Sequence, residues 1–279
     1  MFVKYCTTLF AGIWLLFIAD IAHAQQPLPD KIAANKAKDW QTYRQASIAD
    51  SKMAVYFRAL TSSELEAINS AKSNGQSKAN SKLIEIKSEL TVESSIAGFL
   101  LFLQDYDKIP NWLDNANGSQ LIEQITPSHN IFRIQFSAIW PVSPREMLIE
   151  SRYWQDRQGN VHIKVEDASD HYTSHKNHIA ISIIKAHWLI EPLPNDKLYI
   201  QYRVIANANG KMPSWLANKV ALRSSWRTLK NINQQLPNSD WQYQKLANIL
   251  EYQELIQEPT SGTNEQTKDI MPSNNAELN

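Results

Sequence analysis

The chain has 279 residues, and its 28 lysines and arginines balance 28 aspartates and glutamates, so the formal net charge is zero. With no clustered basic face, this composition argues against a nucleic-acid binder. The length allows one large domain or two small ones. The nine tryptophans and ten tyrosines are many for this length. Such side chains fill ordinary cores, and they also suit the walls of a site for an amphipathic ligand.

The N-terminus has the features of an export signal. Lys4 gives a short positive region, residues 9–18 form an apolar run, and Ala22-His23-Ala24 matches the pattern before a cleavage point. We therefore expect a signal peptide over residues 1–24, cleavage after Ala24 and a periplasmic location. Since the apolar run is shorter than the roughly 20 residues that span a bilayer, an uncleaved anchor is the less favoured alternative. Cys6 is the only cysteine, so the mature chain would have no disulfide, thiolate nucleophile or sulfur-ligated metal.

The first half of the mature chain is predicted to mix strands with short helices. Residues 25–38 are polar and suggest a flexible lead-in, and Asp39 is a candidate N-cap for a short helix beginning at Asp39-Trp40. Alternation predicts strands over 53–60 and 83–90, separated by a loop or frayed helix over 62–80. Apolar residues at helical spacing over 96–103 predict a helix that opens at Ser94 or Ser95 and stops before Ile109-Pro110.

The second half is predicted to be dominated by strands. They cover residues 130–138, 147–154, 161–165, 178–190 and 198–205, with turn signals between neighbouring pairs. A long helix over 213–236 follows, with Trp215, Leu222, Trp226 and Leu229 on one apolar face. From residue 253 to 279 the sequence is polar and is predicted to be a disordered tail. Strands that follow one another as hairpins, with helices gathered at a few places, predict an α+β fold with an antiparallel sheet.

Five sequence motifs occur in the order and spacing of a known family. They are Val55-Tyr56-Phe57-Arg58, Trp112, Trp140-Pro141-Val142-Ser143-Pro144-Arg145-Glu146, Trp188-Leu189-Ile190-Glu191-Pro192 and Asn209-Gly210-Lys211-Met212-Pro213-Ser214-Trp215-Leu216-Ala217-Asn218. Through them the chain resembles the START domain, the family of StAR-related lipid-transfer proteins. The resemblance implies a domain over residues 39–252 with a helix-grip fold, in which a curved antiparallel sheet wraps around the long C-terminal helix. It also implies an internal tunnel for one hydrophobic ligand, such as a lipid or sterol.

Candidate residues for this tunnel follow from strand parity and helix face. In an alternating strand, one set of side chains faces the interior and the other set faces away. The residues predicted to contact the ligand are Phe132, Ile134, Phe136, Arg145, Tyr202, Leu222, Trp226 and Leu229. Arg145 is either a clamp for a carboxylate or phosphate or one member of a structural salt bridge. Arg133 and Arg203 either point to solvent or carry a paired charge into the cavity.

No recognisable catalytic or metal motif competes with this prediction. The chain has neither Gly-x-Ser-x-Gly nor His-Glu-x-x-His. His171, His175 and His178 would share one face only on a helix, whereas their context predicts a loop leading into a strand, so we expect surface histidines.

The sequence therefore predicts a monomeric, non-catalytic protein that binds or transfers a lipid-like ligand in the bacterial envelope. No metal, cofactor or nucleic-acid partner is predicted. The basic flank of the last helix is compatible with transient contact with a membrane surface. An enzyme on the same fold and an envelope protein-interaction module are the alternatives.

Overall fold

The computed structural model describes residues 39–48, 50–70, 82–138 and 143–257. The predicted signal peptide (1–24), the predicted lead-in (25–38) and residues 140–142 of the third motif lie outside the described residues. Within the described part of the chain, no helix is long and apolar enough to span a membrane.

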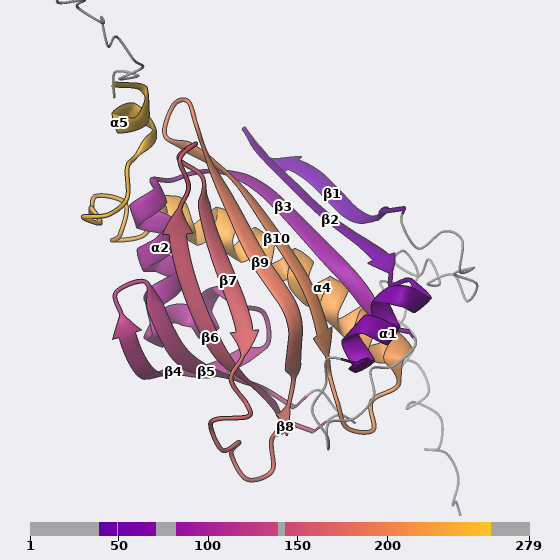
Figure 1. Cartoon of the computed structure of the whole chain (residues 1–279). Helices are drawn as coiled ribbons and strands as arrows, with labels where there is room; N and C mark the ends of the chain where they lie inside the picture. The colour runs from indigo at the N-terminus through magenta and orange to yellow at the C-terminus, as the bar shows by residue number, and fades with distance from the viewer. Residues whose placement is uncertain (1–38, 49, 71–81, 139–142, 258–279) are drawn as a thin grey trace, which may run out of the picture.

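Ten strands form one curved and almost entirely antiparallel sheet (Figure 1). The strand order is β1-β2-β3-β10-β9-β7-β6-β5-β4, and the two-residue strand β8 pairs with β6 in parallel. Most neighbours follow one another in the chain, but β3 pairs with the distant β10, where Ile86 lies opposite Val204. The strands are β1 (Gln41–Ile48), β2 (Ser51–Ala59), β3 (Ile84–Glu93), β4 (Ala116–Thr126), β5 (His129–Phe136), β6 (Arg145–Gln155), β7 (Val161–Asp167), β8 (Ile179–Ala180), β9 (Ser182–Leu193) and β10 (Lys197–Asn207).

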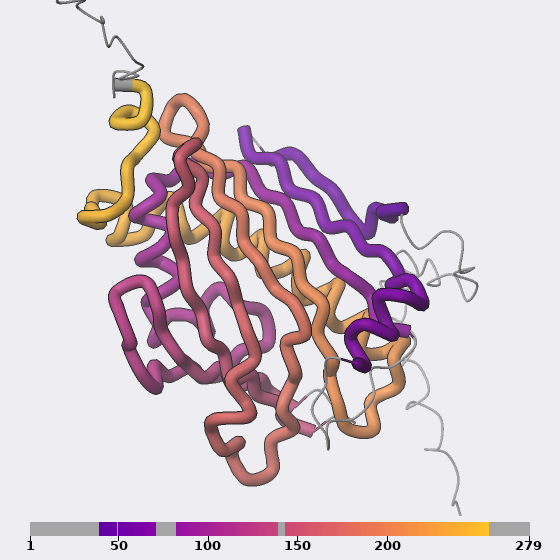
Figure 2. Tube along the Cα trace, viewed as in Figure 1, coloured from indigo at the N-terminus to yellow at the C-terminus, as the bar shows by residue number. Residues whose placement is uncertain are grey.

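The long helix α4 (Ser214–Gln235) lies across the concave, inner face of this sheet (Figures 1 and 2). It packs against β2 and β3. Its buried side chains are Leu222, Trp226, Leu229 and Ile232, which recur at the spacing of one helical face. Since a curved antiparallel sheet wraps around this C-terminal helix, the predicted α+β helix-grip architecture is confirmed.

Helix α2 (Ile96–Gln104) begins directly after β3, where the sequence predicts it. The hydroxyl of Ser95 accepts a hydrogen bond from the backbone nitrogen of Gly98 at 3.0 Å, which caps the first turn. The carboxylate of Glu251 accepts hydrogen bonds from Ile96 and Ala97 at 2.8 and 2.9 Å. A negative charge is favourable at this end of a helix, so the C-terminal segment is tied to the start of α2.

The chain then makes two short helical turns before it returns to the sheet. These are η2 (Tyr106–Lys108) and α3 (Ile109–Trp112), and Pro110 lies in the first turn of α3. A proline is tolerated there because that position needs no intrahelical N–H bond. A last turn, η3 (Leu236–Asn238), follows α4 directly.

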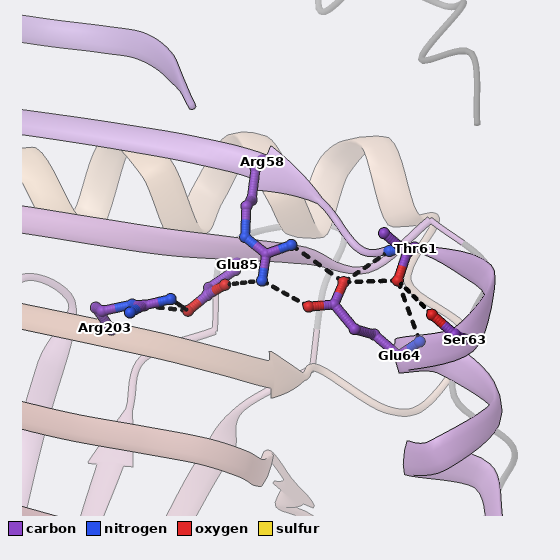
Figure 3. A network of polar contacts seen from close by, with 6 residues as sticks. All are labelled: Arg58, Thr61, Ser63, Glu64, Glu85 and Arg203. Atoms are coloured by element: carbon purple, nitrogen blue, oxygen red, sulfur yellow. Dashed lines mark hydrogen bonds and ion pairs between the residues drawn. The ribbon is translucent and has the colours of Figure 1, made fainter. Parts of the chain in front are cut away.

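Helix α1 (Ser62–Ser70) covers part of the outer face of the sheet, opposite to α4 (Figure 1). Leu65 and Ile68 of this helix pack on the buried side chains of Leu60, Leu83 and Ile205. Polar side chains connect the helix to the same face through ion pairs (Figure 3). A helix therefore forms over residues 62–70 of the segment that was expected to be a loop or a frayed helix, and residues 71–80 of that segment lie outside the described residues.

Two local predictions were wrong. The helix predicted to begin at Asp39-Trp40 is replaced by strand β1, in which Gln41 lies opposite Phe57 of β2. Pairing with β2 gives hydrogen-bond partners to the backbone N–H and C=O groups of this segment, and this outweighs the local capping signal. Trp215 was predicted on the apolar face of α4, but its side chain is 61% exposed.

The first residues of the predicted polar tail form a short helix, α5 (Tyr252–Gln257), and residues 258–279 lie outside the described residues.

Candidate ligand-binding cavity

A cavity of about 500 Å³ lies between the inner face of the sheet, α4 and the α2–α3 segment. Small-molecule sites in proteins are commonly about 300 to 1,000 Å³ in volume, with mostly apolar walls and a few polar groups. The cavity has this character. Its apolar wall includes Ile86, Leu100, Phe132, Ile134, Phe136, Met147, Ile149, Ile163, Ile200 and Val204.

The alternation of β5 and β10 brings several predicted side chains to the cavity. Phe132, Ile134 and Phe136 line it from β5, and Tyr202 lines it from β10. Alternate residues of a strand share one face, so Arg133 lies on the opposite side of β5. Strand parity in the sequence therefore identifies the correct face of these strands.

The predicted face of α4 is only partly correct. Leu229 lines the cavity, but Leu222 and Trp226 are absent from its described lining. Both are buried, and the guanidinium carbon of Arg44 in β1 lies 4.9 Å from the centre of the Trp226 ring. These two side chains fill the seam between helix and sheet, where an apolar face is buried against strands and leaves no space.

Small and polar residues form much of the side of α4 that faces the cavity, beside Val220, Leu229 and Ile232. The lining includes Ala217, Ala221, Ser224 and Thr228, which recur three or four positions apart as one helical stripe. Short side chains leave room between the helix and the sheet. This spacing of small residues is the signal in the sequence that would have identified the cavity side.

Arg145 is the charged residue most deeply placed in the cavity wall. It is 7% exposed and begins β6, on the same face as Met147. Its Nη1 donates to the backbone oxygen of Ala208 and, at 3.4 Å, to that of Asn209, whereas its Nε has no hydrogen-bond partner among the described residues. Burial lowers the pKa of Arg145, although an arginine stays protonated in proteins. Its partners among the described residues are these backbone oxygens and no carboxylate, so the structure does not support the salt-bridge alternative there.

A second polar group of side chains lines the other end of β6. Ser151 lies opposite Asn130 of β5, and both line the cavity together with Ser128 and Tyr153. Asn130 is 3% exposed, and its Oδ1 has no partner among the described residues. Ser88 of β3 also lines the cavity, is 4% exposed and has a hydroxyl without such a partner. Sequence reasoning missed Asn130 and Ser88, because a polar residue on an inward strand position looks the same as an exposed one.

Three tyrosines add hydroxyl groups to the wall. Burial raises the pKa of Tyr106 to about 12, and it also raises the pKa values of Tyr153 and Tyr202. All three side chains therefore stay neutral at physiological pH. Tyr202 stacks on Trp188 of the fourth motif with ring centres 4.2 Å apart, which fixes its ring in the middle of the sheet.

The other two arginines that the sequence singled out lie on the outer face. Arg203 forms an ion pair with Glu85 at 2.6 Å, and its side chain is 44% exposed. Arg133 lies 3.5 Å from the carboxylate of Glu146. Neither lines the cavity. Of the two alternatives, the structure supports an outward orientation for both.

Two of the three histidines lie next to each other. His175 donates its backbone N–H to Glu146 at 2.8 Å, and its ring Nδ1 lies 3.0 Å from the same carboxylate. His178 lies next to this ring, with ring centres 5.8 Å apart. Within the described residues, no group of three or more His, Cys, Asp or Glu side chains is placed to hold a metal ion.

Comparison with solved structures identifies the fold. A STAR-related lipid transfer protein from Xanthomonas axonopodis superimposes with a TM-score of 0.54 and 24% identity, over 71% of this chain and 98% of that one. Human StAR-related lipid transfer protein 5 gives a TM-score of 0.53 and 15% identity, over 73% of this chain and 90% of that one. The lipid transfer and protein localization domain of human StarD13 gives 0.54 and 14%, over 73% and 91% of the two chains. The chain thus has the helix-grip fold of START domains.

The sequence comparison matches a smaller part of the chain. An uncharacterized protein of Pseudomonas aeruginosa, PA1579, is 26% identical over 95 residues, which are 33% of this chain and 46% of that protein. The chain therefore matches less than half the length of this relative. No family model matches the sequence.

Proposed function

We propose that this protein binds one lipid-like molecule in the cavity between α4 and the sheet and carries it without changing it chemically. The observation that supports this most directly is a largely apolar cavity of about 500 Å³ with a few buried polar groups in its wall. Burial of apolar surface would drive binding, at about 25 cal/mol per Å² removed from water. The polar groups would orient the ligand.

The structures with the same fold support the choice of ligand class. The Xanthomonas protein and the human proteins are described as lipid transfer proteins or domains. A shared fold alone does not fix function, and the support specific to this chain is its own cavity. Its apolar wall fits a hydrocarbon body better than it fits a polar metabolite.

The cavity wall favours carriage over catalysis. Its described lining contains no histidine, lysine, cysteine or glutamate, and its single carboxylate is that of Asp114. That carboxylate accepts a hydrogen bond from Asn115 at 2.7 Å and lies 3.5 Å from Arg227. A general acid–base mechanism requires a positioned proton donor and acceptor with tuned pKa values. The carboxyl group of Asp114 and the guanidinium group of Arg145 do not make such a pair.

We also propose that the protein works in the periplasm. The support is the N-terminal sequence, with Lys4, the apolar run 9–18 and the small residues Ala22 and Ala24. Sequencing the N-terminus of the protein from a periplasmic fraction tests this proposal. A mature chain that begins at Gln25 is expected, and an intact N-terminus in the membrane fraction would contradict it.

Native mass spectrometry of the protein purified from its own periplasm tests the proposed ligand. We expect one copurified amphiphile per chain, released under denaturing conditions with unchanged mass. A ligand-free protein that also fails to take up any amphiphile added in solution would overturn the proposal.

A cavity-filling substitution gives a direct test of the location. Ala221→Phe should lower binding of an added amphiphile by at least about a hundredfold, because the ring would occupy space on the cavity side of α4. The matched control is Arg223→Phe, which places the same ring on an exposed position of the same helix. Equal binding by both variants would mean that the ligand lies elsewhere.

A further inference from the structure

The cavity has two chemically different polar ends. At one end Arg145 brings a buried positive charge to the wall. At the other end Asn130, Ser151 and Tyr153 bring only neutral donors and acceptors. Arg145 and Ser151 are six positions apart on β6, which is about 20 Å of strand at roughly 3.3 Å per residue. The wall between them is mostly apolar.

The positive end has an unmet requirement for a negative partner. Burying a charge removes its solvation by water, and a charged partner or hydrogen bonds must compensate for that loss. Among the described residues, Arg145 donates hydrogen bonds only to the backbone oxygens of Ala208 and Asn209, and its Nε has no partner. Guanidinium groups bind carboxylates and phosphates through two parallel hydrogen bonds. An anionic head group would supply the charge and the acceptor that this end lacks.

The neutral end has a different requirement. The side-chain Oδ1 of Asn130 is buried and has no partner among the described residues. A carbonyl oxygen only accepts hydrogen bonds, so its natural partner is a donor such as a hydroxyl group. Ser151 opposite and Tyr153 nearby can each give or accept a further bond. A ligand hydroxyl at this end would satisfy the amide oxygen.

From these two ends we infer the chemical class of the ligand: an anionic amphiphile with an apolar body, whose carboxylate or phosphate pairs with Arg145 and whose far end carries a hydroxyl group that meets Asn130. This inference rests on the proposed function, because it assigns the head group and tail of the ligand in the same cavity.

The test uses the full mature protein, stripped of copurified lipid, and four probes that share one chain length. The probes are palmitate, ω-hydroxypalmitate, hexadecanol and hexadecyl phosphate, and their affinities are measured by isothermal titration calorimetry. We expect palmitate to bind at least about tenfold tighter than hexadecanol, because a hydrogen bond to a charged group is stronger than a neutral one. We expect ω-hydroxypalmitate to bind several-fold tighter than palmitate.

Variants assign each preference to one end of the cavity. Arg145→Met should remove the preference for palmitate over hexadecanol, whereas Arg152→Met, at an exposed position of the same strand, should keep it. Asn130→Leu should remove the preference for ω-hydroxypalmitate and keep the preference for an anion. Because Arg145 also contacts backbone oxygens, Arg145→Gln is a second variant, and preferences are compared as ratios within each protein.

The outcomes separate this inference from the proposed function. Equal binding of palmitate and hexadecanol to the unmodified protein would overturn the inference and leave the lipid-like ligand standing. Failure of all four probes, together with a ligand-free protein from the periplasm, would overturn both. Tighter binding of hexadecyl phosphate than of palmitate would support a phosphate head group, and the reverse would support a carboxylate.

Discussion

The two faces of the sheet differ in whether a buried charged side chain has an oppositely charged partner. Two neighbouring residues of β6 show the difference. Glu146 points to the outer face, is 0% exposed and interacts with Ser174, with Arg133 and with the backbone and ring of His175. Burial opposes its charged form, but these partners lower its pKa overall. Arg145 points to the inner face, is 7% exposed and has no carboxylate partner among the described residues.

The outer face shows the same behaviour at a second place. Glu85 of β3 is 3% exposed and forms ion pairs with Arg58 and Arg203, while Arg58 also contacts Glu64 at 2.7 Å (Figure 3). The ring of Trp40 lies within 5.6 Å of Arg58. These side chains come from β2, β3, β10 and α1, so the network connects separate elements. Paired charges on the outer face thus serve the fold.

On the inner face, Ser88, Asn130 and Arg145 each have one buried polar atom without a hydrogen-bond partner among the described residues. An unsatisfied buried polar group lowers stability, and such groups gather where proteins bind ligands. The comparison therefore predicts that substitutions on the outer face change the free energy of unfolding, and that substitutions on the inner face change binding.

The largest expected effect comes from removing one arginine from each face. Arg58→Met should lower the free energy of unfolding by about 3 kcal/mol, because it leaves the buried Glu85 with only the half-exposed Arg203. Arg145→Met should change it by less than about 1 kcal/mol, because the lost carbonyl hydrogen bonds are offset by relief of an unpaired buried charge. Urea denaturation measures both.

Arg152→Met provides the control for this pair, since its exposed position predicts a change within about 0.5 kcal/mol. If Arg145→Met destabilised the protein as much as Arg58→Met, Arg145 would serve the fold and the contrast between the two faces would fail.

A smaller effect is expected from pH. The hydrogen bonds from Arg58 lower the pKa of Glu64 to about 2, from an ordinary value of 4.5. Because the folded state binds this proton more weakly than the unfolded state, the contact stabilises the fold above about pH 4.5 and is lost as the pH falls towards 2. The Glu64 side chain is 38% exposed, so screening limits the contribution to about 1 kcal/mol or less.

The measurement compares the unmodified protein with Glu64→Gln. The gap between their free energies of unfolding should be largest near neutral pH and should close at acid pH. Since the contact is partly exposed, high salt should also narrow the gap at neutral pH. A gap that stays constant with pH would mean that this outer-face pair does not contribute through its charge.

The part of this arrangement that the sequence predicts is the part that depends on local periodicity. Strand alternation places Phe132, Ile134 and Phe136 on the cavity side. The helical period of α4 identifies Leu222 and Trp226 as buried, but it does not say against what. Both side chains are buried but do not line the cavity. Periodicity predicts burial alone, so it could not distinguish packing against the sheet from contact with the cavity.

Other features depend on residues that are distant in the chain. The pairing of Arg203 with Glu85 joins positions 118 residues apart, and the register of β3 and β10 brings them together. The strand at Gln41–Ile48 likewise forms because it pairs with the edge of β2. No pattern in a short window carries this information, so Glu85 and Asn130 appeared as ordinary polar residues.

The smallest expected effect concerns a single hydroxyl group. Ser88 is 4% exposed on the inner face, and its Oγ has no partner among the described residues. Ser94, the residue directly after β3, is also 4% exposed, but its Oγ donates to the backbone oxygen of Ser95 at 2.9 Å. Ser88→Ala in the ligand-free protein should raise the free energy of unfolding by about 0.5 kcal/mol, because it removes an unsatisfied group, and Ser94→Ala should lower it by about 1 kcal/mol. Chemical denaturation of the two variants decides the point. If both substitutions destabilised the protein equally, Ser88 would have a partner within the fold, and the inner face would be no different from the outer one.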